Sequence, residues 1–341
     1  MKRICLRCPA ARNLGALLIG ATAFAATRPH YGGTLRVEVR EPATAEAPQS
    51  GITLAQLNGP FTITQWTPGS GAVYAADENA PGGRPYLDGV EIRMGRPLAE
   101  QSIALQLGKT DLVELDPNEL RRTPAERRTW SSAPVRLLVL VFGPRIEDAR
   151  VREALALSVD RSAIHSVLLQ RQGEISGALL PQWLTGYAFL FSTAQEASRA
   201  RTLLSAVSPA ARTLSFAVPD PANRRIADRI ALDARDVGLT LTRAAAANPD
   251  VRLLEIRIAS AEPGSALAIA AAQLGLPEPP RADSPEAWYA AERTLLDGFR
   301  VVPLFHLPEV YGAGPRVKGG PGITPLGEWR FENLWLEAGR P

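Results

Sequence analysis

Residues 135–187 constrain the fold of this chain more than any other segment. An apolar run, Val135–Phe142, is followed by a Gly143-Pro144 turn and by a helix start at Asp148. A second helix start at Asp160 precedes a Gly-rich loop and a Leu-Leu-Pro segment that closes on Gly-Tyr. A continuous apolar run is consistent with a buried strand, and strands that alternate with helices are typical of α/β proteins.

The rest of the chain repeats this alternation. Apolar patterns predict strands over residues 31–39, 61–66, 72–75, 90–94, 111–115, 214–218, 239–241 and 301–305. Helical spacing predicts helices over residues 98–107, 194–207, 221–237 and 284–297. Gly108 suits the end of the first of these helices, and Ser284-Pro285 suits the start of the last.

The N-terminus predicts an exported protein. Four basic residues precede a short apolar segment, Leu14–Ala26, and Ala23-Phe24-Ala25 fits a cleavage site. We expect residues 1–25 to be a signal peptide and the mature protein to be periplasmic; an uncleaved anchor is the alternative. Cys5 and Cys8 lie before the apolar segment, so we expect neither a lipoprotein anchor nor a disulfide.

Removing that segment also removes the excess of positive charge. The chain has 38 Lys and Arg against 35 Asp and Glu, and four of the bases lie in residues 1–25, which contain no acid. A nearly neutral mature chain lacks the attraction that nucleic-acid binding needs, so we expect no nucleic-acid partner. The arginine-rich stretch 121–128 is either a contact patch or a solvated helix face, and the second is the simpler interpretation.

The residues that common catalytic centres need are missing. The three histidines, His30, His165 and His306, do not have the spacing of a metal motif, and no nucleophile elbow or phosphate loop occurs. Asp111, Glu114 and Asp116 form a carboxylate cluster, but a hydrolase needs two carboxylates that face each other across a cleft. We therefore expect no enzyme activity, no cofactor and no metal site; a hydrolase is the weakest alternative.

The order of elements in residues 135–187 resembles the hinge and second-lobe entry of periplasmic solute-binding proteins of the peptide/nickel class, which serve ABC importers. Four further blocks are similar to that family in the same order: Tyr31–Leu35, Gly59–Val90, Leu105–Asp111 and Ala291–Lys318. The chain departs from the family in its short interval 40–58. It also departs in Arg257–Gly264, which has no aromatic residue and only one acid, Glu262, whereas many members use an acidic, aromatic-rich segment there to hold a ligand's amino end.

The resemblance implies a type II periplasmic-binding fold. This is a two-lobed α/β protein with mixed sheets, helices on both faces and a hinge of two crossing strands. Lobe I would comprise residues 31–138 and the C-terminal return 306–341, and lobe II would comprise residues 139–305. Val135–Phe142 and Val301–Leu307 are the expected crossing strands.

Side chains at the ends of the crossing strands are the expected ligand contacts. They are Phe142, Arg145, Phe305, His306 and Tyr311. Aromatic rings give apolar contact at a small entropy loss, and an arginine offers a planar fork for a carboxylate. Each has an alternative: both phenylalanines could be core residues, His306 could be structural, and Arg145 could pair with Glu147 or Asp148.

The function implied by the resemblance is capture and delivery. A monomer would bind a short peptide or another small molecule between its lobes and dock onto an inner-membrane ABC permease. A nickel or metal-chelate ligand also occurs in the family. The alternative is an exported ligand-sensing or interaction protein that has lost transport.

Overall fold

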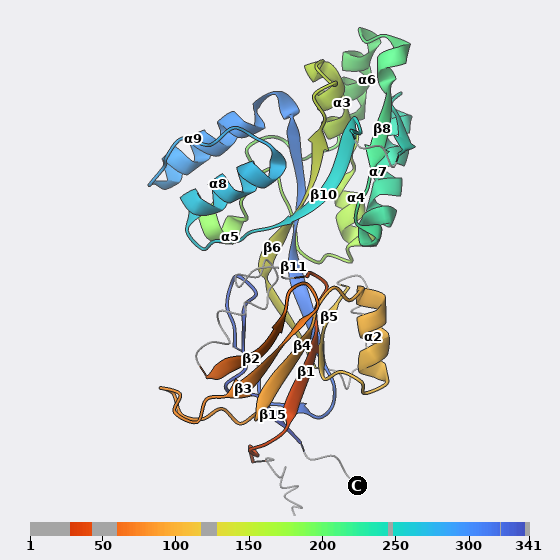
Figure 1. Cartoon of the computed structure of the whole chain (residues 1–341). Helices are drawn as coiled ribbons and strands as arrows, with labels where there is room; N and C mark the ends of the chain where they lie inside the picture. The colour runs from red at the N-terminus through yellow and green to blue at the C-terminus, as the bar shows by residue number, and fades with distance from the viewer. Residues whose placement is uncertain (1–27, 43–59, 117–127, 245–247, 321, 338–341) are drawn as a thin grey trace, which may run out of the picture.

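The computed structural model describes residues 28–42, 60–116, 128–244, 248–320 and 322–337. It shows two lobes joined by two long strands, β6 (Arg128–Phe142) and β11 (Val301–Ala313), that cross from one lobe into the other (Figure 1). The predicted α/β fold with a hinge of two crossing strands is confirmed. The predicted signal peptide lies outside the described residues, and the lobe boundaries at 138/139 and 305/306 stay a prediction.

One mixed sheet runs through both lobes. Its strands follow the order β2-β3-β4-β1-β5-β11-β6-β10-β8-β9, and β7 pairs with β11. β1 is parallel to β4 and β5, whereas β11 is antiparallel to both β5 and β6. The chain therefore leaves lobe I along β6 and returns to it along β11.

Lobe I contains the first and last described parts of the chain. Its elements are β1 (Thr34–Glu38), β2 (Phe61–Thr67), β3 (Gly71–Ala76), β4 (Gly89–Arg93), α2 (Leu98–Gln106), β5 (Leu112–Leu115), β12 (Val317–Lys318), β13 (Gly322–Ile323), β14 (Trp329–Arg330) and β15 (Trp335–Leu336). One apolar cluster joins the first strands to the C-terminal segment, where Trp329, Phe331 and Leu334 are buried.

Lobe II contains most of the helices (Figure 1). Its elements are α3 (Ala149–Ser158), α4 (Arg161–Ala163) with a π-helical turn (Ile164–Leu168), β7 (Glu174–Ile175), α5 (Gln182–Thr185), α6 (Ala197–Ser205), β8 (Thr213–Ala217), α7 (Arg224–Asp236), β9 (Thr240–Arg243), β10 (Val251–Arg257), α8 (Pro263–Leu274) and α9 (Pro285–Leu296). Both predicted helix starts are capped as expected, since the side chains of Asp148 and Asp160 accept backbone N–H groups of Arg150 and Ala163. None of the helices in the described ranges has the length and apolar character of a membrane span.

The apolar run of β6 is buried on both faces. Leu138, Leu140 and Phe142 belong to the cluster that α3, α6 and α7 cover. Leu137, Val139 and Val141 belong to a second cluster, covered by α8 and α9. The run lacks polar alternation because helices pack against both of its faces.

Several elements differ from the prediction, and among them the strand β10 was not predicted at all. β6 begins at Arg128 and β11 ends at Ala313, so both strands are longer than expected. Pro308 lies inside β11 because the register shifts on both sides of it, and a bulge does not need the N–H that proline lacks. The helix α8 was not predicted: its segment is too uniformly apolar to show a helical stripe, and Glu262 caps its start in place of a preferred residue.

Candidate functional site

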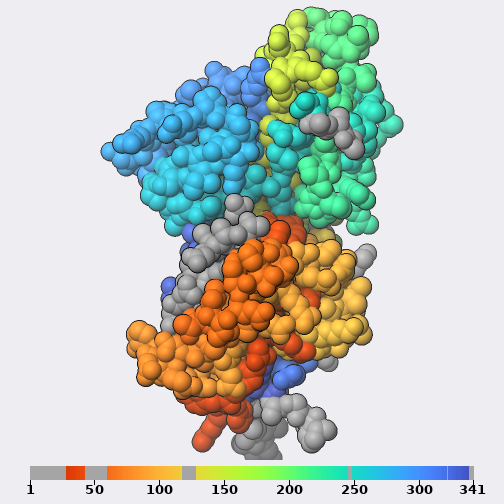
Figure 2. Space-filling model, in the orientation of Figure 1, coloured from red at the N-terminus to blue at the C-terminus, as the bar shows by residue number. Residues whose placement is uncertain are grey.

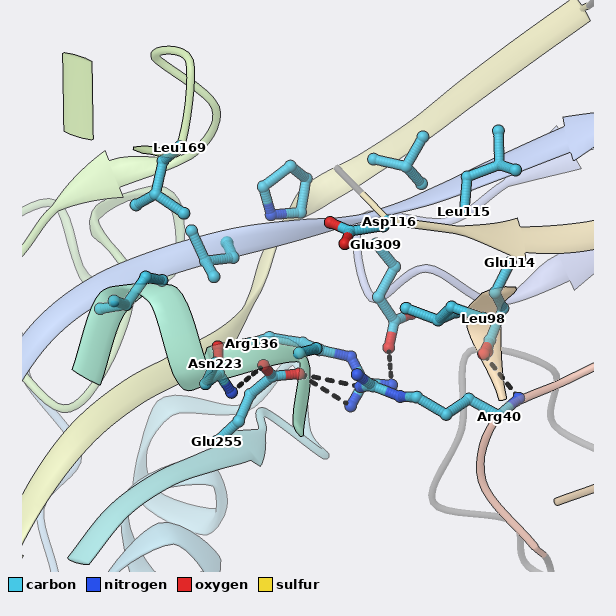
Figure 3. A pocket seen from close by; sticks show the side chains of 15 residues that line it. Arg40, Leu98, Glu114, Leu115, Asp116, Arg136, Leu169, Asn223, Glu255 and Glu309 are labelled. Carbon is cyan, nitrogen blue, oxygen red and sulfur yellow. Dashed lines mark hydrogen bonds and ion pairs between the residues drawn. The ribbon is translucent and has the colours of Figure 1, made fainter. Parts of the chain in front are cut away.

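A pocket lies between the two lobes, where β6 and β11 cross (Figure 3). The cavity itself has a volume of about 60 Å³, and it opens to solvent at its mouth. Its walls come from lobe I, from both crossing strands and from lobe II. The lining residues are Arg40, Leu98, Glu114, Leu115, Asp116, Arg136, Leu169, Ala222, Asn223, Ile226, Glu255, Leu307, Pro308, Glu309 and Val310.

Lobe I brings Arg40 and Glu114 to the pocket. Arg40 follows β1 and Glu114 lies in β5; the two strands are parallel neighbours, so their carboxyl ends share one edge of the sheet. A carboxylate oxygen of Glu114 accepts the backbone N–H of Arg40 at 2.7 Å. The backbone N–H of Glu114 donates to the side-chain oxygen of Gln101 on α2 at 2.8 Å. These two bonds fix the Glu114 backbone and one of its oxygens.

Arg40 also connects lobe I to lobe II. Its guanidinium contacts Glu255 on β10 at 2.8 Å and Asp220, before α7, at 3.3 Å. The amide of Asn223 donates to the other oxygen of Glu255 at 3.2 Å. Figure 2 shows the two lobes in contact across the waist of the molecule. The ion pairs of Arg40 therefore hold the lobes together in this structure.

Arg136 anchors the crossing strands. Its side chain is 7% exposed, and its guanidinium contacts Glu309 on β11 at 2.6 Å and Glu255 at 3.6 Å, together with Glu41 of lobe I. Arg257 on β10 contacts Glu309 from the other side at 3.0 Å. Burial alone would lower the pKa of Arg136, but the surrounding carboxylates outweigh it and raise that pKa. The arginine is thus a charged centre of the hinge.

The pocket carboxylates differ in their electrostatic surroundings. Burial would raise the pKa of Glu255, but the attraction of Arg40 and Arg136 prevails and lowers it to about 2. The pKa of Glu309 is likewise lowered, since Arg136 and Arg257 outweigh its burial. Glu114 shows the opposite result: burial raises its pKa, and the attraction of the two arginines does not offset it.

The five side chains predicted as ligand contacts are not among those that line this pocket. Phe142 and Phe305 are buried in the lobe II core, which is the alternative considered from the sequence. Arg145 is exposed, and its ion pair is with Asp250 at 2.9 Å instead of with a neighbouring acid. Ligand contact by these three residues stays a prediction.

His306 and Tyr311 are fully buried on β11. The Nε2 atom of His306 lies 3.0 Å from the carbonyl oxygen of Leu179 and therefore donates to it, and burial lowers the histidine pKa to about 4. The Tyr311 hydroxyl donates to Glu309 at 2.5 Å, and its ring packs edge-on against Trp329. Tyr311 thus supports a wall of the pocket from behind, and direct ligand contact by either residue stays a prediction.

Another buried carboxylate lies in lobe II, away from the pocket. Glu292 on α9 accepts the backbone N–H groups of Leu179 and Leu180, and the Tyr187 hydroxyl donates to it at 2.9 Å. Burial outweighs these bonds and raises the pKa of Glu292 from 4.5 to about 7. The folded state therefore keeps the Glu292 proton to higher pH than the unfolded chain does. Stability is lost as the pH rises from 4.5 to about 7.

We expect Glu292→Gln to remove this pH dependence. Between pH 4.5 and 7 the wild-type free energy of unfolding should fall by about 3 kcal/mol relative to the variant, on the basis of about 1.4 kcal/mol per pKa unit. Urea unfolding at several pH values measures this difference. Glu286→Gln, at an exposed position of the same helix, is the control and should follow the wild type. A wild-type profile that is flat in this window would contradict the prediction.

Sequence reasoning missed Arg40, Arg136, Glu255 and Glu309 as pocket residues. A signal exists for Arg136 and Glu309: each is a charge inside an otherwise apolar strand, and a charge that must be buried needs a partner. The sequence does not show which partner. In the described part of the chain, no group of three or more His, Cys, Asp or Glu residues could hold a metal ion.

Comparisons with known proteins agree with this architecture. The family model described as bacterial extracellular solute-binding proteins, family 5 middle, matches residues 13–252. No curated protein sequence matches the chain. Among solved structures, the substrate-binding protein CtaP of an ABC transporter of Listeria monocytogenes matches with a TM-score of 0.66 and 17% identity, over 82% of this chain and 66% of that one.

Two further solved structures were determined with ligands. The dipeptide-binding protein of a Pseudoalteromonas species, in complex with Met-Leu, matches with a TM-score of 0.66 and 13% identity, over 82% of this chain and 64% of that one. NikA of Staphylococcus aureus, in complex with Ni(L-His)₂, matches with a TM-score of 0.67 and 15% identity, over 82% and 68%. The chain spans about two thirds of the length of these structures.

These structures share the two-lobed fold, and the family match covers more than half of the chain. The chain belongs to family 5 of the bacterial extracellular solute-binding proteins.

Proposed function

We propose that this protein is the periplasmic solute-binding component of an ABC import system. It captures a short peptide or another small solute between its lobes and delivers it to an inner-membrane permease. The observation that carries this proposal is the pocket, whose walls come from both lobes and from both crossing strands. A solute bound there contacts both lobes at once, so its binding favours the closed arrangement.

The contacts of Arg40 support this mechanism. Opening the lobes separates Arg40 from Glu255 and Asp220, and closing them restores both ion pairs. The closed arrangement is then recognised by the permease, while the open one releases the solute. The relatives named above bind a dipeptide and a nickel–histidine complex, which shows the range of small solutes that this fold accommodates.

Native mass spectrometry tests the capture of a solute. The mature protein, residues 26–341, is expected to carry a small molecule when it is purified from a periplasmic extract. Ala222 lines the pocket mouth, so Ala222→Trp should fill it and reduce the retained fraction by about tenfold or more, which corresponds to about 1.4 kcal/mol. Ala211→Trp, at an exposed alanine of lobe II that does not line the pocket, is the matched control.

An empty wild-type mass, together with no thermal shift against a panel of di- and tripeptides and metal chelates, would contradict solute capture. Retention of the same solute by Ala222→Trp would place the capture site elsewhere. Delivery is tested separately: the loaded protein should co-purify with an inner-membrane ABC permease, and the empty protein should not.

A further inference from the structure

We propose that the interlobe pocket selects a small organic cation, an ammonium or guanidinium compound with an apolar body, and that Glu114 receives the positive charge. This inference rests on the proposed function, because it names the class of solute for the same pocket. Three observations support the proposal: the charge balance of the walls, the contacts of the two arginines, and an unpaired oxygen of Glu114.

Among the described residues that line the pocket, the charge balance is negative. Two arginines, Arg40 and Arg136, stand there against three glutamates, Glu114, Glu255 and Glu309. A pocket with this balance repels an anionic solute and attracts a cationic one, because the charges act across a partly desolvated space.

The two arginines are already engaged. One terminal nitrogen of Arg40 contacts Asp220 and the other contacts Glu255. The terminal nitrogens of Arg136 contact Glu41 and Glu309. An anionic solute would have to displace these carboxylates from buried ion pairs, and removing one partner of such a pair is strongly unfavourable. The arginines therefore neutralise part of the pocket and do not form an anion site.

Glu114, unlike the two arginines, has an atom that can still form a hydrogen bond to a solute. Its side chain is about 4% exposed, and one oxygen accepts the Arg40 N–H, but the other oxygen, Oε1, has no hydrogen-bond partner within the described ranges. An unpaired buried carboxylate oxygen is unfavourable, and the raised pKa of Glu114 reflects that burial. Oε1 is almost wholly covered in this arrangement, so a cation reaches it only when the surrounding side chains move; it then satisfies this oxygen and offsets the desolvation of the carboxylate.

The rest of the pocket suits an organic body. Beside the charged groups, its walls contain the aliphatic side chains of Leu98, Leu115, Leu169, Ile226, Leu307 and Val310. An apolar wall next to one carboxylate with an unpaired oxygen fits an amphipathic amine better than it fits an inorganic ion.

A matched set of three probes tests this selectivity. Hexylammonium, 1-hexanol and hexanoate share a six-carbon body and differ in charge. We expect calorimetry on the full mature protein to show hexylammonium binding more tightly than hexanol by on the order of tenfold, with no binding of hexanoate. Glu114→Gln keeps the shape and an acceptor for the Arg40 N–H, and it should abolish the preference. Glu91→Gln, which removes an acid paired with Arg93 outside the interlobe pocket, is the matched control and should retain it.

Equal binding of hexylammonium and hexanol, or no binding of hexylammonium, would overturn the charge selectivity. A preference that survives in Glu114→Gln would overturn the role of Glu114. The wild-type comparison does not require the variant to fold. A neutral or anionic solute retained in native mass spectrometry would also overturn this inference while leaving solute capture intact, so the two proposals fail in distinguishable ways.

Discussion

Replacing Val139 with aspartate is expected to prevent stable folding of the protein. Val139 is fully buried on β6, between Leu254 of β10 and Pro303 of β11, in the apolar cluster that α8 and α9 cover. The described neighbours in that cluster are apolar, so a carboxylate placed among them would be desolvated. We expect a loss of about 4 kcal/mol or more, a large share of the roughly 5–15 kcal/mol that stabilises a domain.

Circular dichroism with thermal and urea unfolding measures this loss. Val167→Asp is the matched control, because Val167 is 70% exposed and the same substitution there should change stability by less than about 0.5 kcal/mol. If Val139→Asp unfolds at the wild-type midpoint, the central crossing strand is not buried as described.

Arg136→Ala should produce the second-largest effect. The substitution leaves Glu309, Glu255 and Glu41 without one cationic partner at the hinge. Breaking a buried ion pair by removing one member typically costs about 3–5 kcal/mol, because the remaining charge stays desolvated. Arg257 and Arg40 still contact Glu309 and Glu255, so we place the loss at the lower end of that range.

The pH dependence of this variant provides an independent check. In the wild type the pKa of Glu255 is held at about 2, below its ordinary 4.5, so its stabilising effect is present above pH 4.5 and is lost as the pH falls toward 2. Without Arg136 the loss of stability at low pH should be smaller, since the pKa of Glu255 rises toward its ordinary value. Arg93→Ala is the control: Arg93 is largely exposed and pairs with Glu91, and such pairs contribute less than about 1 kcal/mol. An equal stability loss in the two variants would show that Arg136 does not anchor the hinge.

The crossing strands could be predicted because their signal is local. A strand covered on both faces is apolar at nearly every position, and Leu137–Phe142 shows this without reference to the rest of the chain. The helix starts at Asp148, Asp160 and Ser284 were predictable for a similar reason, since a cap depends on a residue and the N–H groups two or three positions later.

Elements without a local signal were missed. The helix α8 has neither a polar stripe nor a preferred cap, and β11 continues past Pro308 only because β6 accommodates a bulge there. The expected ligand contacts show the same difficulty. Phe305 and His306 lie on the predicted crossing strand, but the helices and loops that surround β11 bury their side chains and leave the pocket to its neighbours Leu307–Val310.

The sequence by itself determined the α/β class and the two crossing strands, because apolar periodicity is a property of short segments. The order of the similar blocks along the chain indicated the family. Only the tertiary structure decided the pocket and its charge. Arg40 and Glu255 are 215 residues apart, and Glu114 meets the N–H of Arg40 across 74 residues. Charges pair by distance in space, and the lobes and the crossing strands set those distances only once the chain has folded.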